Sequence, residues 1–389
     1  MSSKHKPSTI AVRTGIESDT QHHAVVPPIY LSTNYGFPSF GDVPTYDYTR
    51  SGNPNRNLLE TALFELESGK GAVVTNCGTS ALNLWVSTFL GPDDLIVAPH
   101  DCYGGTYRLF NTRSLKGDFK VEFVDQSDDT AFSQALAKKP KLILLETPSN
   151  PLVRVVDIAK VCEQAKAIGA LVAVDNTFLT PIFQKPLELG ADFVIHSTTK
   201  FINGHSDVIG GVVITKDEQH ADELSWWGNC IGATGTPFDS YMTLRGIRTL
   251  GPRMRAHEES SQQILEYLKA QSRVKTIYHP SLPQHPGHDI AKRQQTGFGS
   301  MLSFEFDGSM DELKVFVSGL TLFSLAESLG GVESLICHPA TMTHRAMGEE
   351  ALAEAGISHF LLRLSVGLED AGDLIADLEQ AFSLLEVQQ

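Results

Sequence analysis

The first part of the chain shows no regular alternation of hydrophobic and polar residues. Residues 25–56, VVPPIYLSTNYGFPSFGDVPTYDYTRSGNPNR, are rich in Pro, Gly, Asn and Tyr, and their apolar positions follow neither the period of a helix nor that of a strand. Such a segment buries little of its own surface. We therefore expect residues 1–60 to form an extended arm that packs on the body of the protein or on a neighbouring subunit.

From residue 57 onward, helix and strand patterns alternate. Residues 58–69 have the pattern of an amphipathic helix that ends on Gly69, and a further helix is expected over residues 79–89. Seven short aliphatic runs predict strands, at residues 71–76, 95–99, 121–125, 142–146, 171–176, 193–201 and 210–215. Apolar strands joined by helical crossovers predict a mostly parallel seven-stranded sheet in a large domain over residues 61–255.

The remaining residues, 256–389, predict a smaller domain. A long helical stretch leads into the Pro- and Gly-rich segment 278–289, and residues 301–308 and 361–370 have strand patterns interleaved with helices. A chain of 389 residues with 41% apolar content can bury one large core and a second, smaller one. The sequence therefore predicts an α/β protein with two packed domains behind an arm.

Charge and cysteine content exclude several classes of partner. The formal net charge of -15, without a long Lys/Arg run, argues against nucleic acid. The 5 cysteines are scattered and form no CxxC pair, which argues against disulfides and predicts a cytoplasmic protein. No apolar run approaches the ~20 residues that span a bilayer, so no membrane association is expected. His279, His285 and His288 lack further ligands at suitable spacing, so we interpret them as solvated loop histidines and predict no metal site.

Candidate chemistry lies where three predicted strands end, because ligands of such sheets bind at the carboxyl ends of the strands. Lys200 lies where the chain leaves the strand that begins at residue 193 and has Ser197, Thr198 and Thr199 beside it. A lone lysine in a polar loop is ordinarily a surface residue. At this edge of the sheet, however, its amine can form an imine with an aldehyde cofactor while the hydroxyls donate to a phosphate.

Two further positions complete a pattern of three. Asp175 ends the preceding strand; alone it would be read as a helix cap, but paired with Lys200 it can hold a pyridinium nitrogen protonated. Gly78 and Thr79 lie at a strand-to-helix turn, where free N–H groups and the helix dipole suit a phosphate, although ordinary turns use these residues too. Lysine, aspartate and phosphate turn together meet the requirements of pyridoxal 5'-phosphate.

Long strings of the sequence also carry a family resemblance. They are YDYTRSGNP (46–54), APHDCYGGTYRLF (98–110), ETPSNPL (146–152), AVDNTF (173–178), HSTTKFINGHSDV (196–208), SLAESLGGVESL (324–335) and LLRLSVGLED (361–370). Over nearly its whole length the chain resembles the transsulfuration enzymes of the fold-type I, aspartate-aminotransferase-like pyridoxal-phosphate class. Within this family it is most similar to bacterial cystathionine γ-synthases.

The resemblance implies roles for residues around the cofactor. Lys200 would bind it covalently and shuttle protons, Asp175 would pair with its ring nitrogen, and Tyr103 would stack on the ring and is a candidate to accept a proton from the incoming amino group. Asn150 would contact the 3-oxygen and also the substrate. The phosphate would be held by Gly78, Thr79, Ser197 and Thr199, joined by Tyr48 and Arg50 from the arm of a second subunit.

The resemblance also implies substrate contacts. Arg363 and Ser328 would bind the substrate α-carboxylate, the arginine through a two-toothed ion pair. Arg108 and Glu327 would face the distal parts of the substrates. Two positions depart from the family pattern, since Thr79 replaces a common Met and Ser51 stands where related synthases often have a second Arg. Recognition of a succinyl group would then rest more on Arg108 or another group.

The activity implied by the resemblance is a γ-replacement. O-succinyl-L-homoserine would react with L-cysteine to give L-cystathionine and succinate, a step of methionine biosynthesis, in a homotetramer built as a dimer of dimers. Acetyl or phospho esters of homoserine remain open as substrates. Cystathionine γ-lyase activity is the nearest alternative, because Glu327 occurs with both activities; methionine γ-lyase and homoserine sulfhydrylase activities are more remote.

Overall fold

The computed structural model describes residues 5–386, and its larger sheet is built as the sequence predicts. This sheet has seven strands in the order β1-β7-β6-β5-β4-β2-β3. Six strands are mutually parallel, while β7 runs antiparallel to both of its neighbours, β1 and β6. The strands are β1 (Gly71–Thr75), β2 (Leu95–Pro99), β3 (Lys120–Val124), β4 (Leu142–Glu146), β5 (Leu171–Asp175), β6 (Phe193–His196) and β7 (Gly211–Thr215).

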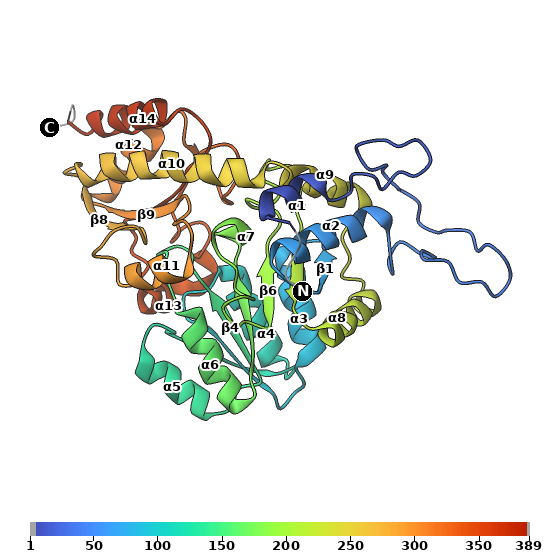
Figure 1. The fold of residues 1–389 in the computed structure, drawn as a ribbon. Coiled ribbons are helices and arrows are strands. Elements are labelled where there is room, and N and C mark those ends of the chain that lie inside the picture. The colour runs from blue at the N-terminus through green and yellow to red at the C-terminus, as the bar shows by residue number, and fades with distance from the viewer. Residues whose placement is uncertain (1–4, 387–389) are drawn as a thin grey trace.

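Helices cover both faces of this sheet, which explains why its central strands β4, β5 and β6 are apolar up to their last residue (Figure 1). One face packs on α2 (Pro54–Leu66), α5 (Asp129–Ala137), α6 (Ile158–Ile168) and α9 (Pro237–Ile247), with Ile10 of α1 (Pro7–Arg13) at its edge. The other face packs on α3 (Gly78–Phe89), α4 (Gly104–Leu115) and α8 (Glu218–Ile231). This three-layer arrangement leaves the carboxyl ends of the parallel strands free for a site.

A second, five-stranded sheet forms a separate core with the order β10-β11-β12-β9-β8. Its strands are β8 (Val274–Tyr278), β9 (Met301–Phe306), β10 (Ser324–Leu325), β11 (Leu335–Cys337) and β12 (Leu361–Ser365). Apolar residues of α10 (Leu250–Lys269), α12 (Met310–Gly319) and α14 (Ala371–Ser383) cover it. The shorter helices α7 (Thr180–Phe183), α11 (His288–Gln294) and α13 (Gly348–Ala355) and the turn η1 (Arg345–Met347) complete the chain.

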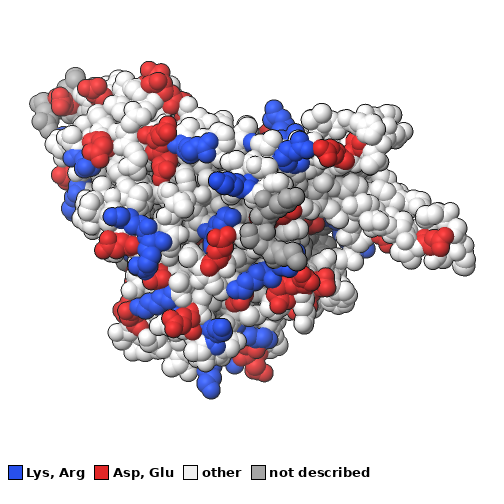
Figure 2. Space-filling view, in the orientation of Figure 1, with Lys and Arg blue, Asp and Glu red and all other residues white. Residues whose placement is uncertain are grey.

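The segment between α1 and α2 projects from the body as a long loop (Figure 1). Its apolar side chains are not covered within the chain, since Phe40, Val43 and Leu31 are 108%, 80% and 68% exposed. Few charged residues lie on it, in contrast to the mixed charges on the visible face of the body (Figure 2). An exposed apolar segment of this kind is typical of a protein–protein contact.

Two local expectations were wrong. The helix predicted to end on Gly69 stops at Leu66, and Ser68 takes the positive φ of 63°. Gly69 is required for space instead, because a Cβ there would lie 2.9 Å from Ile214 Cγ2. His279 and His285 are buried rather than solvated, and burial lowers the pKa of His279 to about 4.

Residues 5–386 contain neither a metal-binding cluster nor a membrane-spanning helix. No set of three His, Cys, Asp or Glu side chains is grouped to hold a metal ion. None of the helices in this range is both long and apolar enough to cross a membrane.

Candidate active site

A cavity of about 340 Å³ lies where β4, β5 and β6 end, between the amino end of α3 and the second sheet. It lies at the edge that the sequence analysis predicts for ligands. The predicted residues that line it are Gly78, Thr79, Tyr103, Asn150, Asp175, Ser197, Thr199, Lys200, Glu327, Ser328 and Arg363. Residues more than 280 positions apart in sequence, such as Gly78 and Arg363, therefore meet in one space.

Lys200 is the nucleophilic amine of this cavity. Its Nζ donates to Ser328 Oγ at 2.6 Å. Burial, together with the positive charge of Arg363, lowers the pKa of Lys200 to about 8, and the negative charge of Glu327 opposes this shift. Ser328 has φ 82°, a backbone conformation that a non-glycine residue holds only when its surroundings fix it, as is common at functional sites. The neutral, nucleophilic form of the Lys200 amine is therefore populated at a pH only slightly above neutral.

This lowered pKa predicts how addition of pyridoxal phosphate to the apoprotein depends on pH. Only the neutral amine attacks an aldehyde, so the rate constant should rise about tenfold per pH unit and level off near pH 8. Stopped-flow absorbance at a range of pH values measures it. Glu327→Gln removes the charge that raises the pKa, so it should move the plateau to lower pH. A rise that continues to the ordinary lysine value of 10.5 would contradict the assignment.

Two carboxylates, the buried Glu146 and the half-buried Asp175, lie side by side at the ends of β4 and β5, where the two residues pair in register. Thr177 N donates to Asp175 Oδ1 at 3.0 Å. Burial raises the pKa of Asp175, and burial together with the charge of Asp175 raises that of Glu146 well above its ordinary value. A cation such as a pyridinium nitrogen beside Asp175 would offset this unfavourable burial.

The turn between β1 and α3 leaves room for a phosphate. A Cβ on Gly78 would lie 2.9 Å from the Ser197 Cβ, so only glycine lets the start of α3 approach the loop after β6 this closely. The first N–H groups of an α-helix have no intrahelical acceptor. Ser197 and Thr199 add hydroxyls to the same cavity. Amine, carboxylate and N–H turn therefore fit pyridoxal phosphate.

Arg363 lies in the middle of β12 and is 2% exposed. Its Nη1 donates to Asn150 Oδ1 at 2.8 Å and its Nη2 to the Ser328 carbonyl at 2.7 Å. The buried Nε has no hydrogen-bond partner among the described residues. Burial lowers the pKa of Arg363. A buried guanidinium with an unsatisfied donor beside a cavity is suited to a carboxylate ligand.

Three predicted residues do not line the cavity. Arg108 is exposed on α4, on the helix that Tyr103 precedes. Tyr48 and Arg50 lie on the arm, where Arg50 Nη1 donates to both the carbonyl and the Oδ1 of Asn229 at 2.8 Å. Ser51 Oγ donates to Asp47 Oδ1 at 2.8 Å and places no positive charge there.

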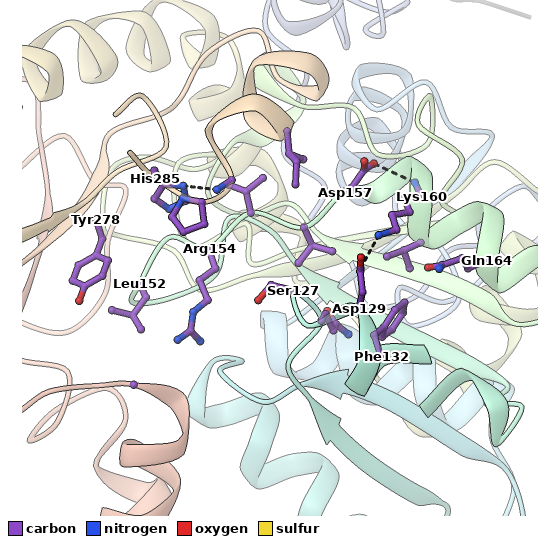
Figure 3. A pocket seen from close by; sticks show the side chains of 18 residues that line it. Ser127, Asp129, Phe132, Leu152, Arg154, Asp157, Lys160, Gln164, Tyr278 and His285 are labelled. Atoms are coloured by element: carbon purple, nitrogen blue, oxygen red, sulfur yellow. Dashed lines mark hydrogen bonds and ion pairs between the residues drawn. The ribbon is translucent and has the colours of Figure 1, made fainter. Parts of the chain in front are cut away.

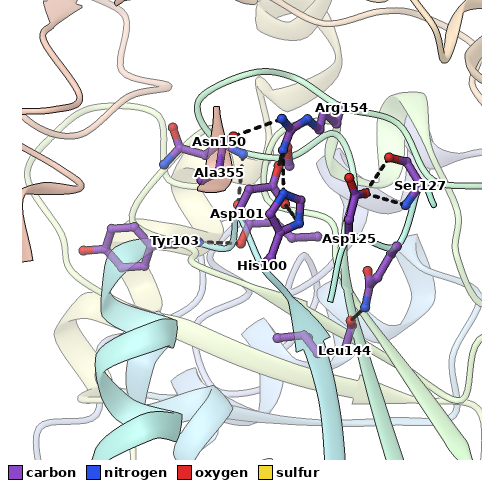
Figure 4. A network of polar contacts seen from close by, with 12 residues as sticks. His100, Asp101, Tyr103, Asp125, Ser127, Leu144, Asn150, Arg154 and Ala355 are labelled. Atoms are coloured by element: carbon purple, nitrogen blue, oxygen red, sulfur yellow. Dashed lines mark hydrogen bonds and ion pairs between the residues drawn. The ribbon is translucent and has the colours of Figure 1, made fainter. Parts of the chain in front are cut away.

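The sequence analysis missed the groups that hold the lining loops. Glu146 accepts from the backbone N–H of Tyr103 at 3.0 Å and of Asn150 at 3.1 Å, so it ties α4 to the loop after β4. Behind it, Asp101 Oδ2 accepts from Ser149 Oγ at 2.7 Å and from Arg154 Nη1 at 3.0 Å (Figure 4). The signal in the sequence that could have found Glu146 is a single carboxylate at the end of an otherwise apolar strand.

Comparison with known proteins extends over the whole described chain. The family described as Cys/Met metabolism PLP-dependent enzyme matches residues 8–383. Cystathionine γ-synthase of Escherichia coli (strain K12) is 59% identical over 377 residues, which cover 97% of this chain and 98% of that protein. Cystathionine γ-lyase of Dictyostelium discoideum is 43% identical over 378 residues, with 97% of each protein covered.

A solved structure gives the same result. The cystathionine γ-synthase from Xanthomonas oryzae pv. oryzae, in complex with cystathionine, matches with a TM-score of 0.98 at 54% identity. The match covers 99% of this chain and 100% of that chain. The similarity therefore includes the arm and both sheets.

Proposed function

Because the chain belongs to the Cys/Met metabolism PLP-dependent enzyme family, we propose that it is a cystathionine γ-synthase. It replaces the succinate of O-succinyl-L-homoserine with the sulfur of L-cysteine and releases L-cystathionine. The observation that carries this proposal is the 59% identity to a synthase, against 43% to a lyase over the same share of the chain. The cavity agrees with it, since an amine, a carboxylate-binding arginine and a phosphate turn face one space.

The chain's own side chains divide the work of this reaction. Pyridoxal phosphate, when bound, supplies an electron sink for charge that develops on the substrate carbons. Arg363 and Ser328 hold the substrate α-carboxylate, which fixes the bond that is oriented for cleavage, and Asn150 accepts a hydrogen bond from Arg363 and so orients its guanidinium. Lys200, whose pKa is lowered to about 8, takes the proton from Cα and moves protons at Cβ and Cγ. Tyr103 lines the cavity, where it stacks on the cofactor ring and accepts a proton from the substrate amino group.

The distal end of the substrate meets the outer part of the cavity. Glu327 is exposed at its rim, and Arg108 lies one turn along α4 from Tyr103. A guanidinium there pairs with the free carboxylate of a succinyl group. Since Ser51 supplies no charge, Arg108 carries this recognition, and the succinyl ester is preferred to the acetyl ester.

The proposal is tested with purified enzyme and three incubations: O-succinyl-L-homoserine alone, the same with L-cysteine, and L-cystathionine alone. Cystathionine and succinate should form fastest in the second. Rapid release of cysteine and 2-oxobutyrate from cystathionine, with little synthesis, would instead make the protein a cystathionine γ-lyase. O-acetyl-L-homoserine in a fourth incubation tests the acyl preference.

The proposed enzyme works in the cytoplasm as a homotetramer, a dimer of active-site-sharing dimers. All five cysteines are free, as suits a reducing compartment.

Each subunit is divided into three parts: the arm (1–60), the cofactor domain (61–255) and the C-terminal domain (256–389). Exposed apolar residues on the arm support a subunit contact that brings Tyr48 and Arg50 to the neighbour's phosphate.

Subunit mixing tests the shared site. In a mixed dimer of Arg50→Ala and Lys200→Ala subunits, the site with an intact Lys200 takes its arm from the Lys200→Ala subunit and so regains Arg50. Random mixing should restore about a quarter of the native sites. The measurement is succinate release after the two variants are co-refolded, with each variant refolded alone as the control. Activity equal to the mean of the two variants would place Arg50 in its own subunit's site.

A further inference from the structure

A second cleft, of about 460 Å³, lies outside the active site, where α5 and α6 face the loop between β8 and α11 (Figure 3). It falls in the size range of small-molecule sites. In Figure 3, Tyr278 and Leu152 lie on one side of the cleft and Phe132 and Gln164 on the other, with Arg154 and Ser127 between them. Nothing in the proposed reaction uses this cleft.

The charges in the cleft balance. Lys160 pairs with Asp129 at 2.6 Å, and Arg154 pairs with Asp101 behind the wall at 3.0 Å. Asp157 Oδ2 accepts from Arg293 Nη2. The cleft therefore attracts neither an anion nor a cation strongly, which favours a neutral or zwitterionic ligand.

The wall contains a buried acceptor without a partner. Gln126 is 7% exposed and lines the cleft, and its Nε2 donates to the Leu144 carbonyl at 2.7 Å. Its Oε1 has no hydrogen-bond partner among the described residues, and neither has Oε1 of Gln164, which also lines the cleft. Buried acceptors of this kind are normally satisfied. A ligand that supplies N–H or O–H donors, such as an ammonium group, would satisfy them.

Arg154 offers the complementary group. Its guanidinium bonds to His100, Asp101 and the Ala355 carbonyl, yet its side chain remains 30% exposed. A guanidinium has five N–H donors, more than these contacts use, so it can also receive a carboxylate. Apolar side chains of Phe132, Val161 and Ile290 complete the lining.

We propose that this cleft binds an α-amino acid with an apolar side chain. Its ammonium group bonds to Gln126, its carboxylate to Arg154, and its side chain packs against Phe132 and Val161. Binding of this ligand also affects the active site through a chain of hydrogen bonds. Arg154 donates to Asp101, and Asp101 accepts from Ser149, the neighbour of Asn150 (Figure 4). This second part, regulation of substrate binding, rests on the proposed function; the binding itself does not.

Binding is tested on the holoenzyme after borohydride has fixed the cofactor to Lys200, because amino acids then cannot react in the active site. Calorimetry with L-leucine and L-methionine should show one site per chain, and L-glutamate should bind at least tenfold more weakly. Ser127→Trp fills the cleft from an exposed position and should weaken L-leucine binding at least tenfold. Thr130→Trp, exposed on α5 but outside the lining, is the matched control and should bind normally. No binding, or binding that Ser127→Trp leaves unchanged, overturns the proposal.

Coupling is measured on the unreduced enzyme. Saturating L-leucine should change the KM for O-succinyl-L-homoserine at least twofold, with a smaller change in kcat, and this response should disappear in Ser127→Trp but persist in Thr130→Trp. A KM that does not respond in the unsubstituted enzyme overturns the regulatory part. Normal calorimetry together with absent synthase activity would overturn the proposed function and leave the binding site standing.

Discussion

Replacing Lys200 with alanine is expected to reduce succinate release by at least about a thousandfold. The residue supplies both the amine that bonds to the cofactor and the carrier that moves protons, and proton transfer alone contributes about 10²–10⁴-fold. Asp175, Arg363 and the Gly78 turn remain in the variant, so it should still bind pyridoxal phosphate non-covalently. Initial rates of succinate release and the cofactor content after gel filtration measure the two effects.

Two controls make the Lys200 result specific. Lys200→Arg keeps a positive charge but cannot form the imine, so its activity should fall as far. Lys216→Ala removes a half-exposed lysine that pairs with Asp192 and should leave the rate unchanged. Retention of more than a tenth of the activity in Lys200→Ala would exclude the assigned chemistry.

Arg363→Ala is expected to lower kcat/KM by about 10²–10⁴-fold for O-succinyl-L-homoserine. A hydrogen bond to a charged group contributes about 1.5–3 kcal/mol, and the carboxylate would lose two of them. The loss should lie mainly in KM, because the α-carboxylate is bound in both the ground state and the transition state. Steady-state kinetics over a wide substrate range separates the two constants.

Arg363 is buried, so folding must be followed in parallel. Arg363→Lys keeps the charge but cannot form the paired contacts to Asn150 and Ser328, and it should recover only part of the affinity. Thermal unfolding of both variants, with and without cofactor, reports on the fold. A normal KM in a folded Arg363→Ala variant would place the carboxylate site elsewhere.

The sheet could be predicted from the sequence because its strands are short apolar runs with helix-length segments between most of them. All seven runs contain strands, although the run predicted over 193–201 ends as a strand at His196. The family match confirms the predicted fold-type I class and the pyridoxal phosphate cofactor. Helix ends were less accurate. Ser68 rather than Gly69 adopts the positive φ, because tertiary packing against β7 fixes the position of Gly69.

The part of the site that could not be predicted consists of groups acting through the backbone. Lys200 and Asp175 have chemistry that their neighbours in sequence make evident. Glu146 acts by accepting two backbone N–H groups from loops 43 and 4 residues away, and no sequence pattern states which loops meet. The second cleft likewise depends on α11 facing α6, a contact between distant segments.

The pairing of β1 with the antiparallel strand β7 determines how late in synthesis a new chain can bind its cofactor. β1 lies at the edge of the sheet and pairs with β7, whose residues are synthesised about 140 positions later. Until those residues leave the ribosome, β1 lacks the strand that holds it in the sheet, and the Gly78 turn has no fixed place beside Ser197. Arg363 emerges later still. The nascent polypeptide must therefore be nearly complete before it can retain its cofactor, and apolar β1 is a vulnerable segment during that interval.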